Sequence, residues 1–364
     1  MAKSVSPHIK ISESTVPRNA PRPLLRVEDL VTTVFINGRN YNAVDHVSFS
    51  VNPGEVLGLV GESAAGKSMT ALSIIRLIRP PAQIVSGRVL FDDTDLLTLS
   101  EPEMSKLRGR DIAMVSQDPM TALNPVKAIG DQLTRVIRLH TPVSKDEAIR
   151  RAIDMMRRVG IPAPEERLRS YPHQFSGGML QRISIAMALS CNPKLLIADE
   201  PTTALDVTTQ AQILRLIERL RKELGMAVIM ITHDLGVIAE VADRVMVMYA
   251  GEVVESGTLD QIFYDPQHPY TWGLLGSLTR VDQPRLARLA QIAGQPPSLI
   301  NPPSGCHFRN RCPHEFAKCT EHPLLEQRAE GGHSDRCWLP PDRKKELRVV
   351  ETGEIGLEAK ESAA

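Results

Sequence analysis

One segment constrains this chain more than any other, because its spacing fits a loop that binds phosphate. Gly61-Glu-Ser-Ala-Ala-Gly-Lys67-Ser68 matches G-x-x-x-x-G-K-[ST] and stands between an apolar run and a helical pattern. In such a unit the backbone N–H groups curl around a phosphate, and the helix adds the positive end of its dipole. Lys67 would reach the outer phosphates of a nucleotide, and Ser68 would offer its hydroxyl to Mg²⁺. The residues predicted to contact the nucleotide or its metal here are Gly61, Ser63, Ala64, Ala65, Gly66, Lys67, Ser68 and Met69.

Two adjacent acids follow a second apolar run, further along the chain. Leu195-Leu-Ile-Ala-Asp199-Glu200 reads as a buried strand that ends in two carboxylates. A strand end beside a phosphate loop is where an Mg²⁺-organising carboxylate belongs, so Asp199 is the candidate for the metal. Glu200 is the candidate general base for an attacking water. Alone, such a pair is usually a solvated strand end, but together with the loop it predicts a catalytic pair.

A second candidate anion site lies at the start of another predicted helix. Ser176, Gly177 and Gly178 precede a run rich in Ile, Ala and Met, so that a hydroxyl and backbone amides are presented together. Standing alone, this segment would be a plain helix N-cap formed by Ser176. The chain therefore carries two phosphate-holding elements of different design.

The apolar runs predict an α/β fold class. Residues 56–60, 195–198 and 228–231 are continuous apolar runs flanked by helical patterns, which is typical of a parallel sheet covered on both faces. Residues 24–51 alternate in short stretches, as antiparallel strands do. Between about 118 and 190 the pattern is helical.

Charge and hydropathy exclude two other classes. Lys+Arg and Asp+Glu both number 43, so the formal net charge is zero. A general nucleic-acid binder normally shows a basic excess, so we expect no nucleic-acid partner. No apolar run approaches the roughly 20 residues that a bilayer span needs, and no basic-then-apolar leader opens the chain. We expect a cytosolic chain that reaches any membrane through partners.

Five short motifs, in this order along the chain, resemble those of the ATP-binding cassette (ABC) family, and the resemblance covers residues 24–338. Residues 175–179 resemble the family's signature loop, although Met179 stands where Gln is more general. Beside the phosphate loop and the acid pair, the further motif residues are Gln117 of the Q-loop, Asp206 of the D-loop (residues 204–206) and His233, the switch histidine.

The resemblance implies a P-loop ABC cassette: a mixed sheet core, an antiparallel β subdomain and an α-helical signature subdomain. It implies an ATPase in which Glu200, His233 and Gln117 are catalytic, and in which Ser68, Gln117 and Asp199 lie around Mg²⁺. Two cassettes would pair head to tail, so that the Ser-Gly-Gly turn of one closes on nucleotide held by the other.

Two positions of this site are less regular. The fourth residue of the phosphate loop is usually Gly in this family, and here it is Ala64; if the position needs a positive φ, Ala costs about 1 kcal/mol. The aromatic side chain that stacks on adenine is Tyr41, with Phe35 as the alternative, because the intervening loop makes the alignment ambiguous.

The branch within the family is also indicated. Residues 117–125, 171–178 and 268–271 resemble the oligopeptide, dipeptide and nickel importers, as do Gly305-Cys306 and the spaced cysteines that follow. The resemblance implies a motor for import of oligopeptides or dipeptides at the cytoplasmic face of the cell (inner) membrane. Its partners would be a second, paralogous ATPase subunit, two transmembrane permease subunits and an extracytoplasmic peptide-binding protein.

Three rival functions stay open. Nickel or another small solute could be the cargo, because a cassette never touches cargo. A soluble cassette ATPase of translation or DNA repair usually has two cassettes or long insertions, and this chain has neither. A binding module without hydrolysis is disfavoured by the presence of Glu200 and His233.

The predicted organisation has four parts. They are a polar tail over residues 1–22, an ABC ATPase domain over 23–260 with its helical subdomain at about 118–190, a C-terminal extension over 261–340, and a charged tail over 341–364 that we expect to be disordered.

Four of the five cysteines gather in the C-terminal extension. In a reducing compartment such a cluster predicts a metal site rather than disulfides. The spacing lacks C-x-x-C pairs, so it is not a zinc-finger or ribbon pattern. Four thiolates suffice for an iron–sulfur cluster or a structural zinc, and nearby histidines allow a mixed zinc site. Because some members of the resembled branch bind a [4Fe–4S] cluster here, we expect that cluster, with zinc or no metal as alternatives. The predicted ligands are Cys306, Cys312, Cys319 and Cys337.

Overall fold

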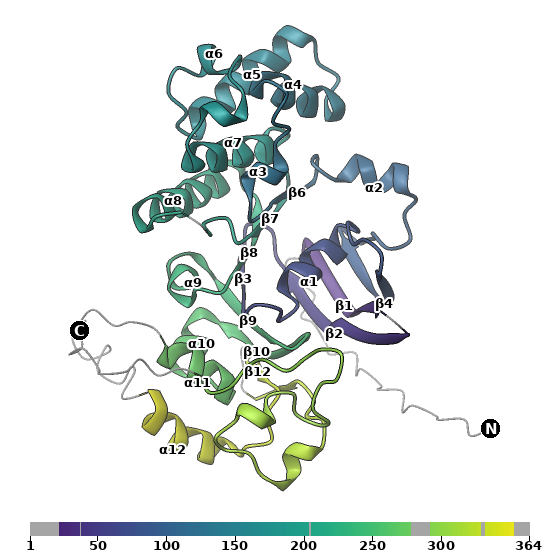
Figure 1. Cartoon of the computed structure of the whole chain (residues 1–364), viewed down its shortest axis with the longest axis vertical. Helices are drawn as coiled ribbons and strands as arrows, with labels where there is room; N and C mark the ends of the chain where they lie inside the picture. Colours follow the sequence, from purple (N-terminus) through teal and green to yellow (C-terminus); the bar gives the residue numbers. More distant parts are fainter. Residues whose placement is uncertain (1–21, 37, 204, 278–291, 329–331, 353–364) are drawn as a thin grey trace.

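The structure, a computed structural model, consists of two sheets with helices packed on them (Figure 1). The polar tail predicted over residues 1–22 lies almost wholly outside the described residues, as does Ala204 of the predicted D-loop. The structure describes residues 22–36, 38–203, 205–277, 292–328 and 332–352.

Parallel strands form the core of the larger sheet. The apolar runs singled out in the sequence become three of these strands, and all their residues are buried because helices cover both faces, as predicted. In spatial order the parallel strands are β9 (Arg244–Tyr249), β3 (Val56–Val60), β8 (Ala227–Thr232), β7 (Leu195–Asp199) and β6 (Ile112–Val115).

A smaller antiparallel sheet lies beside this core. It confirms the antiparallel strands predicted for residues 24–51. The first helix, α1 (Lys67–Ile74), lies between the two sheets, and one cluster of buried side chains joins all three (Figure 1). In spatial order the strands of the smaller sheet are β2 (Arg39–Val51), β1 (Leu25–Ile36), β4 (Ala82–Phe91) and β5 (Thr94–Asp95).

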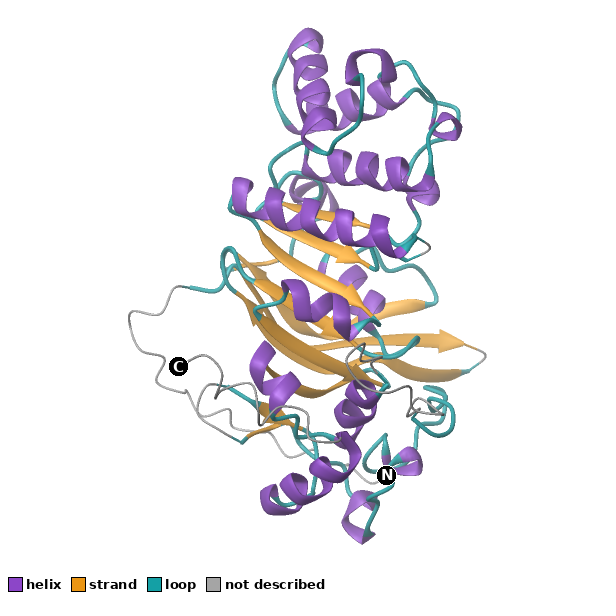
Figure 2. Cartoon of the chain, turned by 90° about the vertical axis from the view of Figure 1, so that its left-hand side faces the viewer, coloured by secondary structure: helices purple, strands orange, loops and turns teal. Residues whose placement is uncertain are grey.

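A helical region projects from one end of the molecule, at the top of Figures 1 and 2. It confirms the helical pattern predicted between residues 118 and 190. Its elements are α3 (Pro119–Ala122), α4 (Ile129–His140), α5 (Lys145–Arg158), α6 (Pro164–Arg167), the 3-10 turn η1 (Pro172–Gln174) and α7 (Gly177–Leu189); α2 (Glu101–Leu107) precedes β6.

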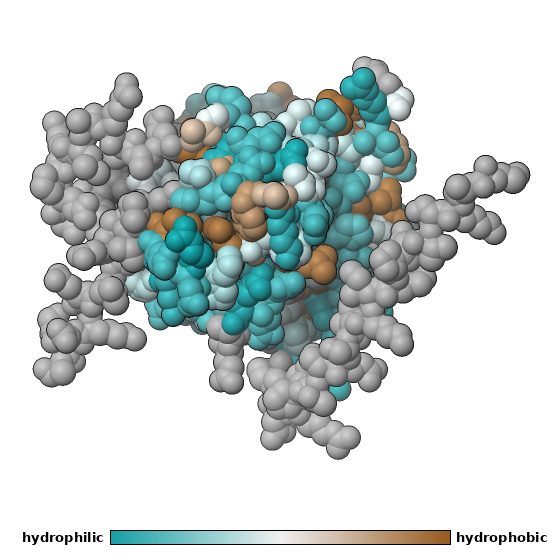
Figure 3. Space-filling model, turned by 90° about the horizontal axis from the view of Figure 1, so that it is seen from below, coloured by the Kyte–Doolittle hydropathy of each residue, from teal (hydrophilic) through white to brown (hydrophobic). Residues whose placement is uncertain are grey.

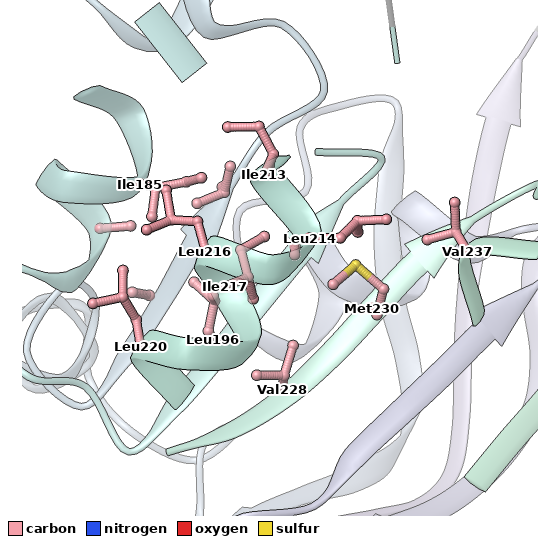
Figure 4. Close-up of a cluster of buried hydrophobic side chains, with 14 of the residues drawn as sticks. Ile185, Leu196, Ile213, Leu214, Leu216, Ile217, Leu220, Val228, Met230 and Val237 are labelled. Carbon is pink, nitrogen blue, oxygen red and sulfur yellow. The ribbon is translucent and has the colours of Figure 1, made fainter. Parts of the chain in front are cut away.

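The longest described helix, α8 (Val207–Leu224), lies between β7 and β8 in the chain and packs against both strands. It begins at Asp206, whose Oδ1 accepts a hydrogen bond from the Thr209 N–H at 2.9 Å. Figure 4 shows its apolar side chains packed against Leu196 of β7 and Val228 and Met230 of β8. The shorter α9 (Leu235–Val241) follows β8 and covers the same sheet face.

The C-terminal extension continues the larger sheet rather than forming a core of its own. Its β12 (Ser334–Asp335) pairs with β10 (Glu252–Thr258), which in turn pairs with β9. Phe308 is buried against the main core cluster. Seen from below, this end is mainly hydrophilic, with small hydrophobic patches between polar side chains (Figure 3). The remaining elements are α10 (Leu259–Tyr264), α11 (Pro269–Gly276), η2 (Arg309–Arg311), η3 (Ala317–Thr320) and β11 (Glu326–Gln327).

The expectation of a disordered tail after residue 340 is wrong for its first part. Residues Pro341–Thr352 form α12, which packs beside α11. Lys344 is fully buried and donates to both carboxylate oxygens of Asp335, at 2.7 Å to Oδ2. A buried ion pair therefore joins this charged helix to β12. Among the described helices, none has the length and apolarity that crossing a membrane requires.

Candidate functional site

The predicted site residues converge because four neighbouring parallel strands end at one edge of the sheet. The phosphate-type loop follows β3, and His233 follows β8. Asp199 ends β7 and Glu200 follows it, while Gln117 follows β6. Carboxyl ends of parallel strands are where open α/β sheets place ligands. A cavity of about 960 Å³ opens at this edge, and loop residues 62–69 line it together with Gln117, Glu200 and His233.

The loop after β3 has the backbone that its sequence predicts. Gly61 and Gly66 have φ of 153° and 102°, and a Cβ on either would meet a backbone carbonyl oxygen, at 2.2 Å and 2.5 Å. Ala64 also has a positive φ, of 64°, so the methyl that replaces the usual glycine hydrogen is strained. The loop leads directly into α1, so that the first N–H groups of this helix point toward the cavity.

Lys67 is poised at the centre of this loop. Its side chain is buried, and its Nζ donates to the carbonyls of Gly61 and Glu62 at 2.7 Å and 2.9 Å. Burial lowers the pKa of this ammonium, although Glu200 and Asp199 act against that shift. A cation held by loop carbonyls at a helix start is placed to bind an anion.

The predicted metal-side pair meets as expected. Ser68 donates from Oγ to Asp199 Oδ1 at 3.0 Å, across a separation of 131 residues in the chain. Burial raises the pKa of Asp199, and the neighbouring charge of Glu200 adds to this effect. A buried carboxylate beside a hydroxyl supplies the oxygen ligands that Mg²⁺ prefers.

Glu200 is the hub of the candidate catalytic residues. Gln117 donates from Nε2 to its Oε2 at 3.1 Å, and His233 Nδ1 lies 3.4 Å from its Oε1. Thr203, which sequence reasoning missed, donates from its hydroxyl to Oε2 at 2.9 Å. Glu200 has a φ of 46°, and its N–H donates to the Ile231 carbonyl of β8 at 2.9 Å. A strained backbone that neighbouring strands hold in place is typical of residues under functional constraint.

Two separate regions outside the loop also line the cavity. Tyr41 lines the cavity with Val34, while Phe35 is 44% exposed and is not among the lining residues, so the geometry favours the first choice of aromatic. Gln295, Pro296 and Leu299, from the extension, line the same cavity. Nothing in the local sequence marked these three, because the fold brings them there.

The second predicted anion cradle lies away from this cavity. Ser176 N-caps α7, accepting from the Met179 N–H at 3.4 Å, and neither it nor Gly177 nor Gly178 lines the cavity. A Cβ on Gly178 would meet Thr209 of α8 at 2.9 Å, so this glycine allows a close helix approach. Asp206, as the N-cap of α8, also lies outside the cavity.

The four cysteines of the extension line one small cavity, together with Phe308 and Trp338. Burial raises the pKa of Cys306 to about 11 and those of Cys312 and Cys337 to about 12. Among the described residues, no three of the sulfurs lie within 4.8 Å of one another. A tetrahedral zinc with Zn–S near 2.3 Å would set them about 3.8 Å apart. The space between them is about 10 Å³, roughly room for one water. All four thiols line this space, but their spacing is wider than one tetrahedral zinc requires. The fourth ligand candidate is Cys319.

A second group of metal-type donors lies next to these cysteines. Glu252 is buried, with His322 Nε2 at 2.7 Å from Oε1 and His307 Nδ1 at 3.3 Å from Oε2. Arg336 Nη1 lies 3.7 Å from Oε1 and already supplies a compensating positive charge. Burial alone would raise the pKa of Glu252, but the His322 hydrogen bond and the Arg336 charge lower it. This group is therefore a charge-paired network that ties the extension to β10.

Comparison with known proteins agrees with this geometry. The sequence pattern of the ABC transporter family matches residues 44–203, and that of the oligopeptide/dipeptide transporter C-terminal region matches residues 254–319. The chain is 51% identical over 322 residues to the dipeptide transport ATP-binding protein DppD of Bacillus subtilis, covering 88% of this chain and 96% of that protein. It is 46% identical over 323 residues to the oligopeptide transport ATP-binding protein OppD of Escherichia coli, covering 88% and 95%.

Solved structures share the cassette. The ATP-binding cassette MJ0796, described as a dimer in a post-hydrolysis state bound to ADP and Pi, is 27% identical. It covers 65% of this chain and 98% of its own, with a TM-score of 0.59. The protein cbiO1 of Clostridium perfringens gives a TM-score of 0.58 at 28% identity, covering 67% and 91%. By its cassette fold and by near-half identity along most of its length, this chain belongs to the ABC transporter family, among the oligopeptide and dipeptide transport ATP-binding proteins.

Proposed function

We propose that this chain is the ATP-hydrolysing subunit that powers import of oligopeptides or dipeptides through an ABC transporter. One observation carries the proposal. Lys67, Ser68 and Glu200 with its partners line one cavity at the ends of adjacent parallel strands, and Asp199 is hydrogen-bonded to Ser68. The names of the relatives favour a peptide cargo over nickel or another small solute.

Binding follows from the loop. The N–H groups of residues 63–69 surround the phosphates, and Lys67 leaves the carbonyls of Gly61 and Glu62 to pair with the outer phosphate oxygens. Ser68, Asp199 and Gln117 would hold Mg²⁺, which would supply positive charge beside the phosphates. Tyr41, which lines the same cavity, stacks on the adenine base.

Hydrolysis is assigned to Glu200. Its carboxylate accepts a proton from water that attacks the γ-phosphate, and Thr203 and Gln117 orient it through their hydrogen bonds. His233, exposed at the end of β8 and 3.4 Å from Glu200, contacts the γ-phosphate. The strained backbone of Glu200 keeps this carboxylate at the cavity edge.

A second cassette completes the site. Because Ser176, Gly177 and Gly178 lie outside the cavity of their own chain, they are free to cap nucleotide held by a partner. Val207, beside Asp206, is 84% exposed at the same end of α8, as suits a surface that a partner covers. We propose a paralogous ATPase subunit as that partner. Two transmembrane permeases hold the pair at the cytoplasmic face of the membrane, and an extracytoplasmic peptide-binding protein delivers cargo.

The cysteine cavity is proposed as a structural metal centre that staples the extension. Four thiols around one space, in a segment without a core of its own, support this role. Cys306, Cys312, Cys319 and Cys337 would be the ligands. A [4Fe–4S] cluster is the first choice because the chain resembles a branch of which some members bind such a cluster here, and zinc is the alternative.

The decisive test is Glu200→Gln in the assembled transporter. Loss of the general base should lower ATP turnover at least about a hundredfold while ATP binding persists. Glu223→Gln, an exposed change on α8, is the matched control and should leave turnover intact. Equal turnover in Glu200→Gln and the unchanged protein would defeat the assignment. Uptake of labelled dipeptides, longer peptides and nickel by the assembled transporter, reconstituted in lipid vesicles, then identifies the cargo.

A further inference from the structure

The cysteine-bearing extension touches the phosphate loop through one buried arginine. The side chain of Arg311 is 5% exposed. It donates two parallel hydrogen bonds to the Glu62 carboxylate, from Nη1 to Oε2 at 2.6 Å and from Nη2 to Oε1 at 3.0 Å. Glu62 directly follows Gly61 in the loop. Paired bonds of this kind fix both the position and the orientation of a carboxylate.

The same loop residue is held at its backbone as well. The Glu62 N–H donates to the Tyr270 hydroxyl at 2.8 Å, and its carbonyl accepts from Lys67 Nζ at 2.9 Å. Tyr270 belongs to α11, near the start of the extension. Glu62 therefore links the extension on one side to the phosphate-binding lysine on the other.

Arg311 also contacts the segment that leads to another part of the cavity lining. Its Nε donates to the Ala293 carbonyl at 2.9 Å, and Nη2 approaches the Ile292 carbonyl at 3.4 Å. The chain then continues to Gln295 and Leu299, which line the nucleotide cavity. One guanidinium thus links the phosphate loop to the segment before Gln295.

Aromatic side chains keep the arginine in this place. The Arg311 guanidinium lies 5.8 Å from the ring centre of Tyr249 and 5.9 Å from that of Phe308, and these rings pack on each other and on Tyr270. A lysine could not replace this arginine, because its ammonium can neither form two parallel bonds to a carboxylate nor stack flat on an aromatic ring.

From these contacts we propose that Arg311 is a positioning residue for ATP: it fixes the phosphate loop through Glu62 and the segment that leads to Gln295 through the carbonyls of residues 292 and 293, so that the extension sets how tightly nucleotide is held. The inference rests on the proposed function in one respect, that the cavity takes ATP. It does not depend on which metal, if any, the cysteines bind.

The test compares two buried arginines of the extension. Arg336 also donates to backbone carbonyls, those of Val253 and Pro323, but it does not touch the phosphate loop. In the full-length chain, titrated with a fluorescent ATP analogue and Mg²⁺, Arg311→Lys should raise the Kd about tenfold through loss of the paired charge-assisted bonds. Arg336→Lys should stay within about twofold of the unchanged protein, because its carbonyl contacts lie away from the site.

A double-mutant cycle removes the concern that Arg311→Lys merely unfolds the extension. Glu62→Gln lies in the cassette and should raise the Kd by a similar factor, and adding Arg311→Lys to it should weaken binding little further. In the assembled transporter the KM for ATP should rise while kcat changes less than about twofold, because Arg311 is not in contact with Glu200.

The outcomes separate this inference from the function on which it rests. An unchanged protein that does not bind ATP would overturn the proposed function itself. If the unchanged protein binds ATP, then equal Kd values for the two arginine variants, or additive effects of Glu62→Gln and Arg311→Lys, would overturn the positioning role alone.

Discussion

The two candidate sites of this molecule are built in opposite ways. The nucleotide cavity lies where β3, β8, β7 and β6 end side by side, so hydrogen-bonded strands place its catalytic groups. The cysteine cavity is lined by short turns between η2, η3 and β12, which have little backbone pairing of their own. A sheet fixes its strand ends whether or not ligand is present, whereas turns need side-chain anchors or a metal. The cassette site is therefore preformed, whereas the cysteine cavity lacks such a frame of paired strands.

The largest expected effect is at the cysteine cavity. Cys312→Ser should remove the bound metal and lower the stability of residues beyond 300 by an amount on the order of 2–4 kcal/mol, since the turns lose their staple. Iron, sulfide and zinc analysis of the purified chain, with hydrogen exchange of the extension, measures both. Cys191→Ser is the control, because this half-buried cysteine follows α7, far along the chain from the other four. Unchanged metal content in Cys312→Ser would contradict the ligand assignment.

A smaller effect is expected at the preformed cavity. Tyr41→Ala should weaken ATP binding by roughly 1–3 kcal/mol, which is the usual worth of an aromatic ring stacked on a base. Calorimetric titration with ATP and Mg²⁺ measures it. Phe35→Ala, at the exposed end of β1, should leave the affinity unchanged because its ring is not among the cavity-lining residues. The reverse ranking of the two variants would move the stacking role to Phe35.

The smallest effect concerns strain within the preformed loop. Ala64→Gly should raise the free energy of unfolding by about 0.5–1 kcal/mol, because relief of a left-handed alanine outweighs the added freedom of the unfolded chain. Urea unfolding of the full chain measures it. Ala65→Gly is the control: Ala65 is buried and has no positive φ, so glycine there should destabilise. Loss of stability in both variants would show that Ala64 is not strained.

The same contrast explains what the sequence could predict. The loop around Lys67 and the acids at 199 and 200 were found because each follows an apolar run at a spacing that determines strand, turn and helix. His233 was found through its resemblance to the switch histidine of the family. Their meeting followed from the rule that parallel strands end at one edge. Thr203 was missed because a threonine after two acids carries no distinctive pattern.

What stayed hidden depends on contacts between distant segments. Gln295 and Leu299 reach the nucleotide cavity only through the fold of the extension, and Arg311 is one arginine among many until Glu62 is seen beside it. The helix α12 was taken for a disordered tail for the same reason. Its buried Lys344 finds a partner in Asp335, and charge composition alone does not reveal such a pairing.

Arg311 and Cys312 are consecutive residues, and this adjacency has a thermodynamic consequence. Coupling between two bound states is reciprocal: whatever one does to the affinity of the other is returned by the same factor. If the arginine steadies ATP, then ATP steadies the arginine, and with it the neighbouring sulfur. Nucleotide should therefore slow alkylation of the Cys312 thiol in metal-free protein, so that ATP bound in the cassette protects a cysteine of the extension.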